Sequence, residues 1–398
     1  MFRKIKKKNW QNGFIKEVFD SSNEKQKSYS KSILQRMDLL YKKNDFLPQY
    51  LFKYYSPTSQ NILDIKNQRL WMAHPNFFND PFDCNIGYDR VNFEKRKLIQ
   101  IINEIGCVDH SKYDSGFTIE EKDRIMRSKI EDISYWNSSI ESYSDAKRKV
   151  LDNKSNDFKK NINRRLDDAT QEIDDKVGKL KNIDIRVACF SNFDRYDEFY
   201  KQIVMWSHYA DNHRGFCVEY DLSFLKPENN LKIPDRSFYD DKDKYLNERN
   251  QAIIRAGIFP VEYTAKRINI PFSKLEKIKI KSSGNIFYNS NIDELIYKTF
   301  LVKSANWNYE KEWRIIVDEN ICKYYENKIP FPYIKAIYLG SKADNELINT
   351  MIDIGKEINA EVIIVKMDGQ KFILESDSTW SYEYDREKSK SNDPYSRI

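Results

Sequence analysis

The densest group of chemically capable side chains lies in the segment Tyr309–Val317. On an extended strand, side chains alternate between two faces, so Glu310, Glu312 and Arg314 share one face. Two carboxylates and a guanidinium are costly to bury in an otherwise apolar segment unless they pair. Two interpretations stay open: a surface strand with an Arg–Glu pair, or a site in which one glutamate acts on a substrate that the other group orients.

A second group lies in the segment Trp206–Gly215, which holds two of the four histidines. His208 and His213 are five residues apart, a spacing that does not suit a zinc pair on one helix face. One interpretation is a helix that ends at His213 and Arg214, with glycine as its stop. In the other, His208 and Tyr209 hydrogen-bond a ligand.

Three further segments carry groups that could contact a ligand. Asn79 lies in an aromatic loop over residues 71–84, where it can cap local backbone groups or face a site. Lys53 and Tyr54 end the first predicted strand, where a lysine is unusual and could meet an anionic ligand. Ser191 ends another predicted strand, and it either caps the next turn or binds a ligand.

The composition excludes several classes of protein. The chain has 398 residues, with 67 basic and 61 acidic side chains and a net charge of +6. Its 11 glycines form neither G-x-G-x-x-G nor G-x-x-x-x-G-K, which argues against a phosphate-binding glycine loop. The five cysteines are odd in number and none forms C-x-x-C, so a zinc ribbon or a disulfide framework is not expected. We predict no metal.

The same sequence predicts a cytoplasmic protein. No run of about eighteen apolar residues is present, so we expect no membrane span. The basic N-terminus is not followed by an apolar core, so we expect no secretory signal.

Short strands and one long helical region must hold the candidate side chains. Alternation and turn signals predict strands over 51–55, 70–73, 186–191, 215–221, 260–263 and at the end of 300–317, with helices over 62–65 and 197–210. A strand, a helix and a strand follow over 334–339, 344–358 and 361–366. An apolar eleven-residue period over 158–180 predicts a long helix, and Thr118 with Glu121 predicts a capping box.

These elements predict an α+β fold: a mixed, mainly antiparallel sheet core with a large α-helical insertion and a helical N-terminal segment. The predicted boundaries are a basic helical segment over 1–48, a core over 49–91 and 183–380, a helical insertion over 92–182 and a loose tail over 381–398.

Taken in order, these segments resemble one bacterial family, the domain of unknown function 2971 family. The motifs that carry the resemblance are LFKYYS, LWMAHPNFFNDPFDC, VACFSN, MWSHYADNHRGFCVEYD, VEY, WNYEKEWRI and AIYLG. They extend from about Leu51 to Gly340, with the helical region near 92–182 resembling an insertion. The family name carries no activity, so the resemblance implies a fold neighbourhood.

The layout is also similar to that of the ADP-ribosyltransferases. That superfamily places a polar residue on the first strand, an aromatic residue or serine on a middle strand and a glutamate on a late one. The resemblance implies Lys53 or Tyr54, Ser191 and Glu312 in these places, with Glu310 two residues earlier. It further implies NAD as substrate, in a reaction where a carboxylate stabilises the positive charge that develops on the ribose.

The predicted site follows from this resemblance. The catalytic residues are Glu312 and Glu310, and the NAD-binding residues are Lys53, Tyr54, Asn79, Ser191, His208, Tyr209 and Arg314. An aromatic ring such as Tyr54 or Tyr209 would stack on nicotinamide, while Lys53, Arg214 or Arg314 would meet the pyrophosphate.

Two other functions remain open. In the first, Asp80 or Asp83 joins the segment Glu312–Arg314 in a metal-dependent nuclease. In the second, the chain is a non-catalytic ligand- or partner-binding module in anti-phage defence, with the helical insertion 92–182 as the contact. The transferase reading predicts a toxin or defence effector that modifies an unknown protein or nucleic-acid target.

Overall fold

The computed structural model describes residues 47–107, 116–130, 141–181, 185–223, 236–267, 269–276, 278–280, 286–287 and 299–377. The predicted helical N-terminal segment, apart from residues 47–48, and the predicted tail over 381–398 lie outside these residues. Two compact units divide the described chain: a sheet unit from residues 1–84, 184–267 and 300–398, and a helical unit from 85–183 and 268–299. None of the described helices combines the length and apolar composition of a membrane span.

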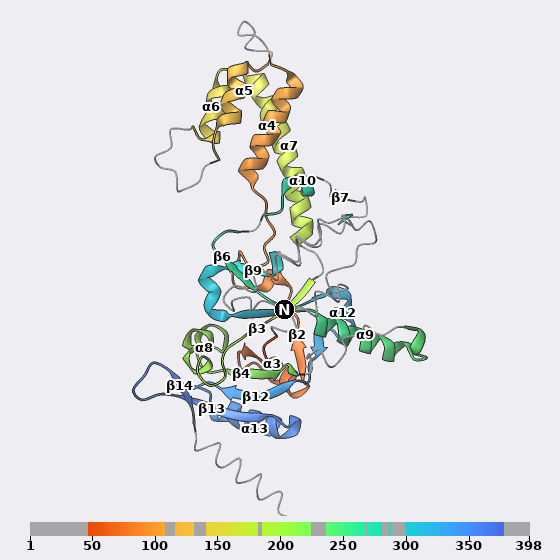
Figure 1. Cartoon of the computed structure of the whole chain (residues 1–398), viewed down its shortest axis with the longest axis vertical. Coiled ribbons are helices and arrows are strands. Elements are labelled where there is room, and N and C mark those ends of the chain that lie inside the picture. The colour runs from red at the N-terminus through yellow and green to blue at the C-terminus, as the bar shows by residue number, and fades with distance from the viewer. Residues whose placement is uncertain are drawn as a thin grey trace, which may run out of the picture. The chain divides into compact units, whose positions relative to one another are not determined.

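The sheet unit is organised by an eight-stranded mixed sheet within the described residues, in the order β14-β13-β12-β4-β1-β3-β10-β5 (Figure 1). Its strands are β1 (Tyr50–Tyr55), β3 (Ile185–Ser191), β4 (Phe216–Asp221), β5 (Ile258–Pro260), β10 (Glu312–Asp318), β12 (Ile334–Leu339), β13 (Glu361–Met367) and β14 (Leu374–Ser376). Only β12 and β13 pair in parallel, and all other neighbours in this sheet are antiparallel. The predicted α+β class with a mainly antiparallel sheet is therefore confirmed.

Short pairs of strands flank the main sheet. In the sheet unit, β2 (Arg69–Trp71) pairs with β11 (Lys328–Pro330), and β6 (Glu262–Thr264) pairs with β9 (Val302–Ser304). The predicted single strand over 260–263 is thus two strands, β5 and β6, that belong to different sheets.

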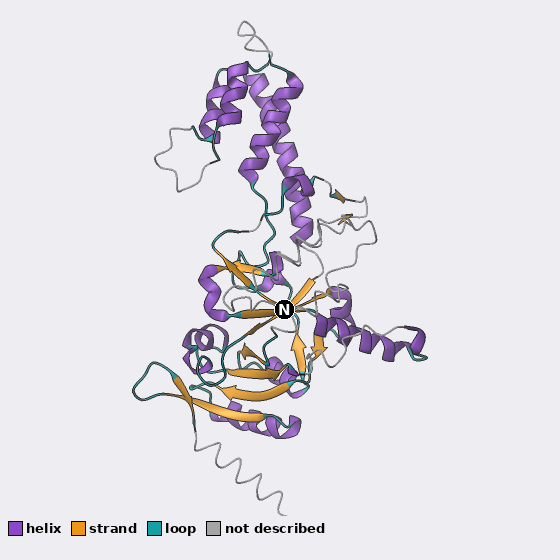
Figure 2. Ribbon diagram, in the orientation of Figure 1, coloured by secondary structure: helices purple, strands orange, loops and turns teal. Residues whose placement is uncertain are grey.

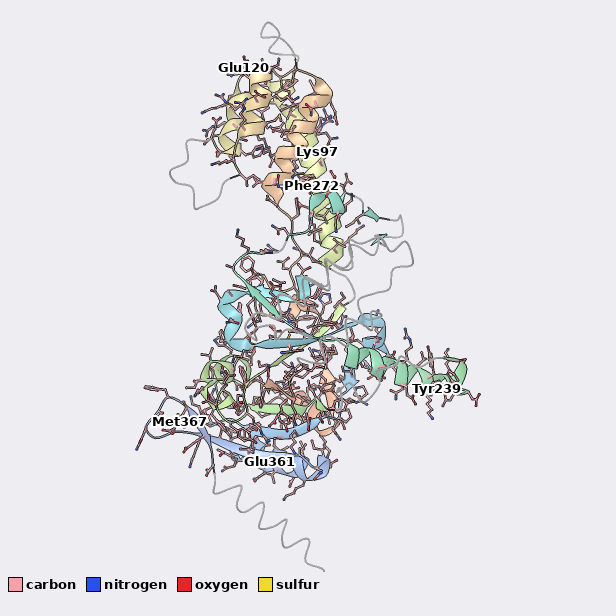
Figure 3. All side chains as sticks on the ribbon, in the orientation of Figure 1. Lys97, Glu120, Tyr239, Phe272, Glu361 and Met367 are labelled. Carbon is pink, nitrogen blue, oxygen red and sulfur yellow. The ribbon has the colours of Figure 1, made fainter. Side chains whose placement is uncertain are left out.

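The helices of the sheet unit, drawn in Figure 2, range from single 3₁₀ turns to α9 with 15 residues. They are α3 (Ser59–Lys66), η3 (Pro75–Phe77), η4 (Phe199–Lys201), α8 (Ile203–Tyr209), η7 (Arg236–Phe238), α9 (Lys242–Ala256), η8 (Ala305–Glu310), α12 (Glu319–Tyr324) and α13 (Asn345–Ile358). The helix α13 is the crossover that a parallel pair such as β12 and β13 requires. It begins where the Asp344 carboxylate accepts from the Leu347 amide, and it ends at Asn359 in the left-handed conformation. Figure 3 labels Glu361 and Met367, the two ends of β13.

An aromatic core fixes α8 against the sheet. Phe52 of β1 stacks on Phe199 with their ring centroids 4.8 Å apart, and Tyr54 meets the edge of Trp206 at 5.2 Å. Phe52, Phe199 and Trp206 are fully buried. Because β1 and α8 share this core, the polar groups at the ends of both elements are held on rigid supports.

The interpretation in which this helix ends at His213 and Arg214 is wrong, whereas the predicted range 197–210 ends one residue beyond the observed helix. The helix α8 ends at Tyr209, and Asp211, Asn212 and His213 then adopt positive φ angles of 46°, 53° and 73°. A Cβ atom on Gly215 would lie 2.1 Å from the carbonyl oxygen of Tyr55. Glycine is therefore needed here because two backbones approach closely, and not because it caps a helix.

The helical unit contains α4 (Arg90–Ile105), α5 (Ile119–Arg127), α6 (Tyr143–Asp152), α7 (Asn156–Lys181) and the short α10 (Phe272–Leu275), with the strands β7 (Lys279–Ile280) and β8 (Ile286–Phe287). The predicted capping box is confirmed: Thr118 and Glu121 each accept from the other's backbone amide. The predicted long helix is α7, which buries Ile162, Leu166 and Ile173 along its apolar seam.

This unit differs in extent from the predicted insertion over 92–182. It begins at Asn85 and also takes in residues 268–299, which the sequence assigns to the core. Phe272 of α10 (labelled in Figure 3) packs against Phe93 at 6.1 Å between ring centroids and under the guanidinium of Arg96 at 4.6 Å. These aromatic contacts tie the later segment to α4.

Candidate functional site

The candidate site lies where two neighbouring strands separate. Strands β1 and β3 are joined through one residue pair, Phe52 with Ser191, and do not pair beyond it within the described residues. By contrast, β1 pairs along its whole length with β4, and β3 pairs along its whole length with β10. A cavity of about 580 Å³ is lined by residues from both sides of this separation.

Most of the predicted site residues line this one cavity. They come from β1, the loop after η3, β3, α8, η8 and β10: Lys53, Tyr54, Asn79, Ser191, His208, Tyr209, Glu310 and Glu312. Arg314 is the exception, because its fully buried side chain lies behind the cavity wall. Arg214, considered for the pyrophosphate, is not among the lining residues.

The two glutamates reach the cavity by a route that differs from the predicted strand. The strand β10 begins at Glu312, and Glu310 is the last residue of η8. Between them Lys311 adopts the left-handed conformation with φ 45°, which turns the chain from the 3₁₀ helix into the strand. Both glutamates are buried, at 3% and 4% exposure. The prediction that one continuous strand aligns them is therefore wrong, although both line the cavity.

A buried lysine that the sequence analysis missed joins the acids. The ammonium of Lys303 on β9 lies 2.5 Å from Glu310, 3.1 Å from Glu312 and 3.4 Å from Asp83. Its signal in the sequence is the same as that of Lys53: one lysine within an apolar stretch, here FLVKSANW. Such a residue is rarely buried unless it is paired.

Arg314 is the second cation of this buried network and binds both Glu312 and Asp83. Its Nε donates to Glu312 Oε1 at 2.7 Å and its Nη2 to Glu312 Oε2 at 3.0 Å, a two-pronged pair that fixes the carboxylate. The same Nη2 donates to Asp83 at 2.6 Å, and Nη1 donates to the Phe300 carbonyl at 2.7 Å. Arg314 therefore holds Glu312 in place and is not available to a ligand in the cavity.

The surroundings drive the pKa values of the two glutamates apart. Burial raises the pKa of Glu312, but the cations Arg314 and Lys303 outweigh it and lower that pKa to about 2. Burial, together with the nearby charge of Glu312, raises the pKa of Glu310 above its ordinary value. Two neighbouring carboxyl groups with opposite shifts are suited to different tasks, one as a permanent anion and the other as a group that gains and loses a proton.

The last two side chains of α8 contact η8, Tyr209 through Glu310 and His208 through Tyr309. The Tyr209 hydroxyl donates to Glu310 Oε1 at 2.5 Å and accepts from the Asn79 amide at 3.5 Å. Burial and the Glu310 charge both raise the pKa of Tyr209, so its hydroxyl stays protonated at neutral pH. His208 meets the Tyr309 hydroxyl at 3.3 Å. These contacts link the end of α8 to η8 beside the cavity.

Lys53 is a second lysine that lines the cavity. Its ammonium donates to the Cys189 carbonyl at 3.1 Å, across the gap between β1 and β3. It lies 5.5 Å from the Tyr55 ring centroid and 5.8 Å from that of Phe190. No ion pair joins Lys53 to a carboxylate in the described part of the chain, and burial lowers its pKa. The cavity thus contains a cation that is available to an anionic ligand.

The acids considered for a metal-dependent nuclease have other partners. Asp83 pairs with Arg314 and Lys303, and Asp80 accepts from the Phe82 amide at 2.8 Å in the turn that it begins. Within the described ranges, no group of three histidine, cysteine or acidic side chains has the arrangement of a metal site. No observation in this structure favours the nuclease over the other functions.

Comparison with known proteins gives one family. Residues 205–315 match the model of the family described as Protein of unknown function (DUF2971). No curated protein and no solved structure matches the chain. The matched stretch contains part of the site, namely His208, Tyr209, Lys303, Glu310, Glu312 and Arg314. This match supports the resemblance to the DUF2971 family that the motifs predicted, over residues 205–315.

Proposed function

We propose that the cavity binds NAD and that its two glutamates promote cleavage of the bond between nicotinamide and ribose. One observation carries this proposal: three neighbouring strands bring Lys53 and Tyr54 of β1, Ser191 of β3 and Glu312 of β10 to the wall of one cavity. The similarity to ADP-ribosyltransferases led us to expect these residue types on these strands. A volume of about 580 Å³ lies in the usual range of small-molecule sites.

Each charged group has a role in the proposed reaction. As the bond breaks, its electron pair leaves with the nicotinamide nitrogen, and positive charge develops on the ribose. The anionic Glu312, held by Arg314 in a site largely shielded from water, stabilises that charge. An acceptor hydroxyl, amine or water then attacks the anomeric carbon, and its proton passes to Glu310, whose raised pKa suits a general base.

The uncharged and cationic parts of the wall fit the rest of the ligand. The partly buried ring of Tyr209 offers a surface for the planar nicotinamide, whereas the ring of Tyr54 is packed in the aromatic core. The Lys53 ammonium suits the pyrophosphate, since no carboxylate of the described residues lies within ion-pair distance of it, although the charge of Glu312 acts on it. Ser191 can hydrogen-bond a ribose hydroxyl from the strand between them.

Nicotinamide release from labelled NAD tests the proposal. We expect release by the wild-type chain and a loss of at least about a hundredfold in Glu312→Gln, as for loss of a group that stabilises transition-state charge. Glu310→Gln keeps one oxygen that can accept from Tyr209 or from Lys303, but not from both, and it cannot take up a proton, so we expect release to fall there as well. Glu198→Gln is the matched control, because Glu198 pairs with Lys311 and does not line this cavity.

The outcomes separate the functions. Equal release by wild type and both glutamate variants would contradict the assigned chemistry. No release from NAD, combined with divalent-dependent cutting of DNA or RNA, would favour the nuclease. No activity in either assay would leave the partner-binding module. Circular dichroism of each variant checks that it is folded. The cytoplasmic location and the toxin or defence role stay predictions, as does the partner contact through the helical insertion.

A further inference from the structure

Two large aromatic side chains stand exposed on the wall of the same cavity. Trp71 is 47% exposed and Phe77 is 82% exposed, and both line the cavity that contains the two glutamates. Single exposed aromatic residues are common on protein surfaces. Two that share one cavity with a charged network are unusual, because exposed ring surface is costly in water and gains most from a stacked ligand.

Both rings are carried by rigid backbone. Trp71 ends β2, where it pairs with Lys328 of β11. Phe77 ends η3, which starts with Pro75 and is capped by His74, whose Nδ1 accepts from the Asn76 amide at 3.1 Å. A fixed φ at the proline and a capped first turn limit the positions that the Phe77 ring can take. The surface is therefore organised before a ligand arrives, which lowers the entropy lost on binding.

A polar acceptor lines the same cavity as these rings. Asn61 lines the cavity, and its Nδ2 donates to the Ser56 carbonyl at 2.9 Å. Its Oδ1 takes no part in that hydrogen bond. No hydrogen bond to this oxygen is present among the described residues. A carbonyl oxygen in a cavity that also presents stacking surfaces suits the exocyclic amino group of adenine, which is a donor.

We propose that Trp71 and Phe77 form a stacking subsite for the purine base of an adenine nucleotide, with Asn61 as acceptor for its amino group and Lys53 as partner of its phosphate. This deepens the proposed function, on which it rests for the choice of NAD, by assigning the second ring of the dinucleotide. Adenine then occupies the exposed aromatic part of the cavity and nicotinamide the part near the glutamates. Stacking on aromatic side chains supplies base affinity of the required size.

Binding of AMP to the full chain, measured by isothermal titration calorimetry, tests the subsite without any turnover. We expect wild type to bind AMP, and Phe77→Ala to weaken that binding about tenfold or more. Phe77→Tyr keeps a ring and should stay within about threefold of wild type. Phe238→Ala is the matched control, since Phe238 is 84% exposed but does not line the cavity.

Ribose 5-phosphate, which lacks the base, serves as the second probe, and its affinity should not change in Phe77→Ala. The inference is overturned if wild type fails to bind AMP, if Phe77→Ala binds it as tightly as wild type, or if ribose 5-phosphate loses affinity to the same extent. AMP binding that depends on Phe77 without NAD cleavage would support the subsite and sink the proposed reaction. NAD cleavage by a chain whose AMP binding does not depend on Phe77 would support the proposed reaction and sink the subsite.

Discussion

The buried guanidinium of Arg314 provides the sharpest test of how the site is held together. Its side chain has no exposed surface and bonds Asp83 at 2.6 Å and Glu312 at 2.7 and 3.0 Å. In Arg314→Met the side chain still fills much of the space, but it carries no charge. Asp83 and Glu312 then share Lys303 as a cation partner, at 3.4 and 3.1 Å, and Lys303 is also paired with Glu310.

The expected cost follows from these uncompensated charges. Removing one partner of a buried ion pair destabilises a protein by about 3–5 kcal/mol. That corresponds to a fall of roughly a hundred- to several-thousand-fold in the folding equilibrium constant. Because whole domains are stable by about 5–15 kcal/mol, Arg314→Met is expected to bring the sheet unit close to unfolding.

Urea unfolding followed by tryptophan fluorescence measures the loss, since Trp71, Trp206, Trp307 and Trp313 all lie in the sheet unit. Arg214→Met is the control: this arginine is exposed in the same unit, and its loss should change stability by less than about 0.5 kcal/mol.

A second variant separates charge from packing in this test. If unpaired charge causes the loss, Glu312→Gln in the Arg314→Met background should restore about 1 kcal/mol or more, since it removes one orphaned carboxylate. A loss below about 1 kcal/mol in Arg314→Met, or a further loss in the double variant, would refute the reasoning.

Three further predictions concern stability and binding. Burial raises the pKa of Glu312, but its buried cation partners hold it at about 2, below the unfolded value of about 4.3. The ionised carboxylate therefore stabilises the fold above about pH 4.5, and this stabilisation is lost as pH falls towards 2. Urea midpoints measured between pH 5 and 2.5 should fall more steeply in wild type than in Glu312→Gln. Lys53→Met removes a cation with no ion-pair partner among the described residues, so the urea midpoint should stay unchanged or rise. The same variant should weaken AMP binding at least about fivefold by calorimetry. A lowered midpoint with unchanged AMP binding would contradict this. Gly340→Ala places a Cβ atom 2.2 Å from the carbonyl oxygen of His213 and should cost more than about 2 kcal/mol in urea unfolding, whereas Gly178→Ala, which meets open space in α7, should stabilise its helix by about 0.5–1 kcal/mol.

Local signals predicted individual elements of the fold well. The strand over 334–339 has the observed bounds, and the helix over 344–358 differs only in that Asp344 is its cap. The Thr118 capping box was readable because its bonds join residues three apart. Such features depend on neighbours along the chain, which the sequence displays directly. The interpretation of Gly215 as a helix stop failed because the close backbone approach at this glycine depends on a distant strand.

Residue types alone selected several of the side chains that line the cavity. Lys53 stood out as a lysine on an apolar strand, and Glu310 and Glu312 as acids in an apolar segment. Burying a charge is costly, so a charge in such a segment already implies a partner, a ligand or a surface position. The sequence could not choose among these three, because each depends on what lies across space.

The tertiary structure made that choice through contacts between segments far apart in the chain. Arg314 meets Asp83 across 231 positions, and Lys303 reaches three acids that no local pattern connects to it. The opposite pKa shifts of Glu310 and Glu312 follow from these contacts, because a charge responds to every neighbouring charge and to burial, whatever their positions in sequence. The sequence by itself therefore determined which groups are available for chemistry, and folding determined which of them meet, which are neutralised and where a ligand can enter.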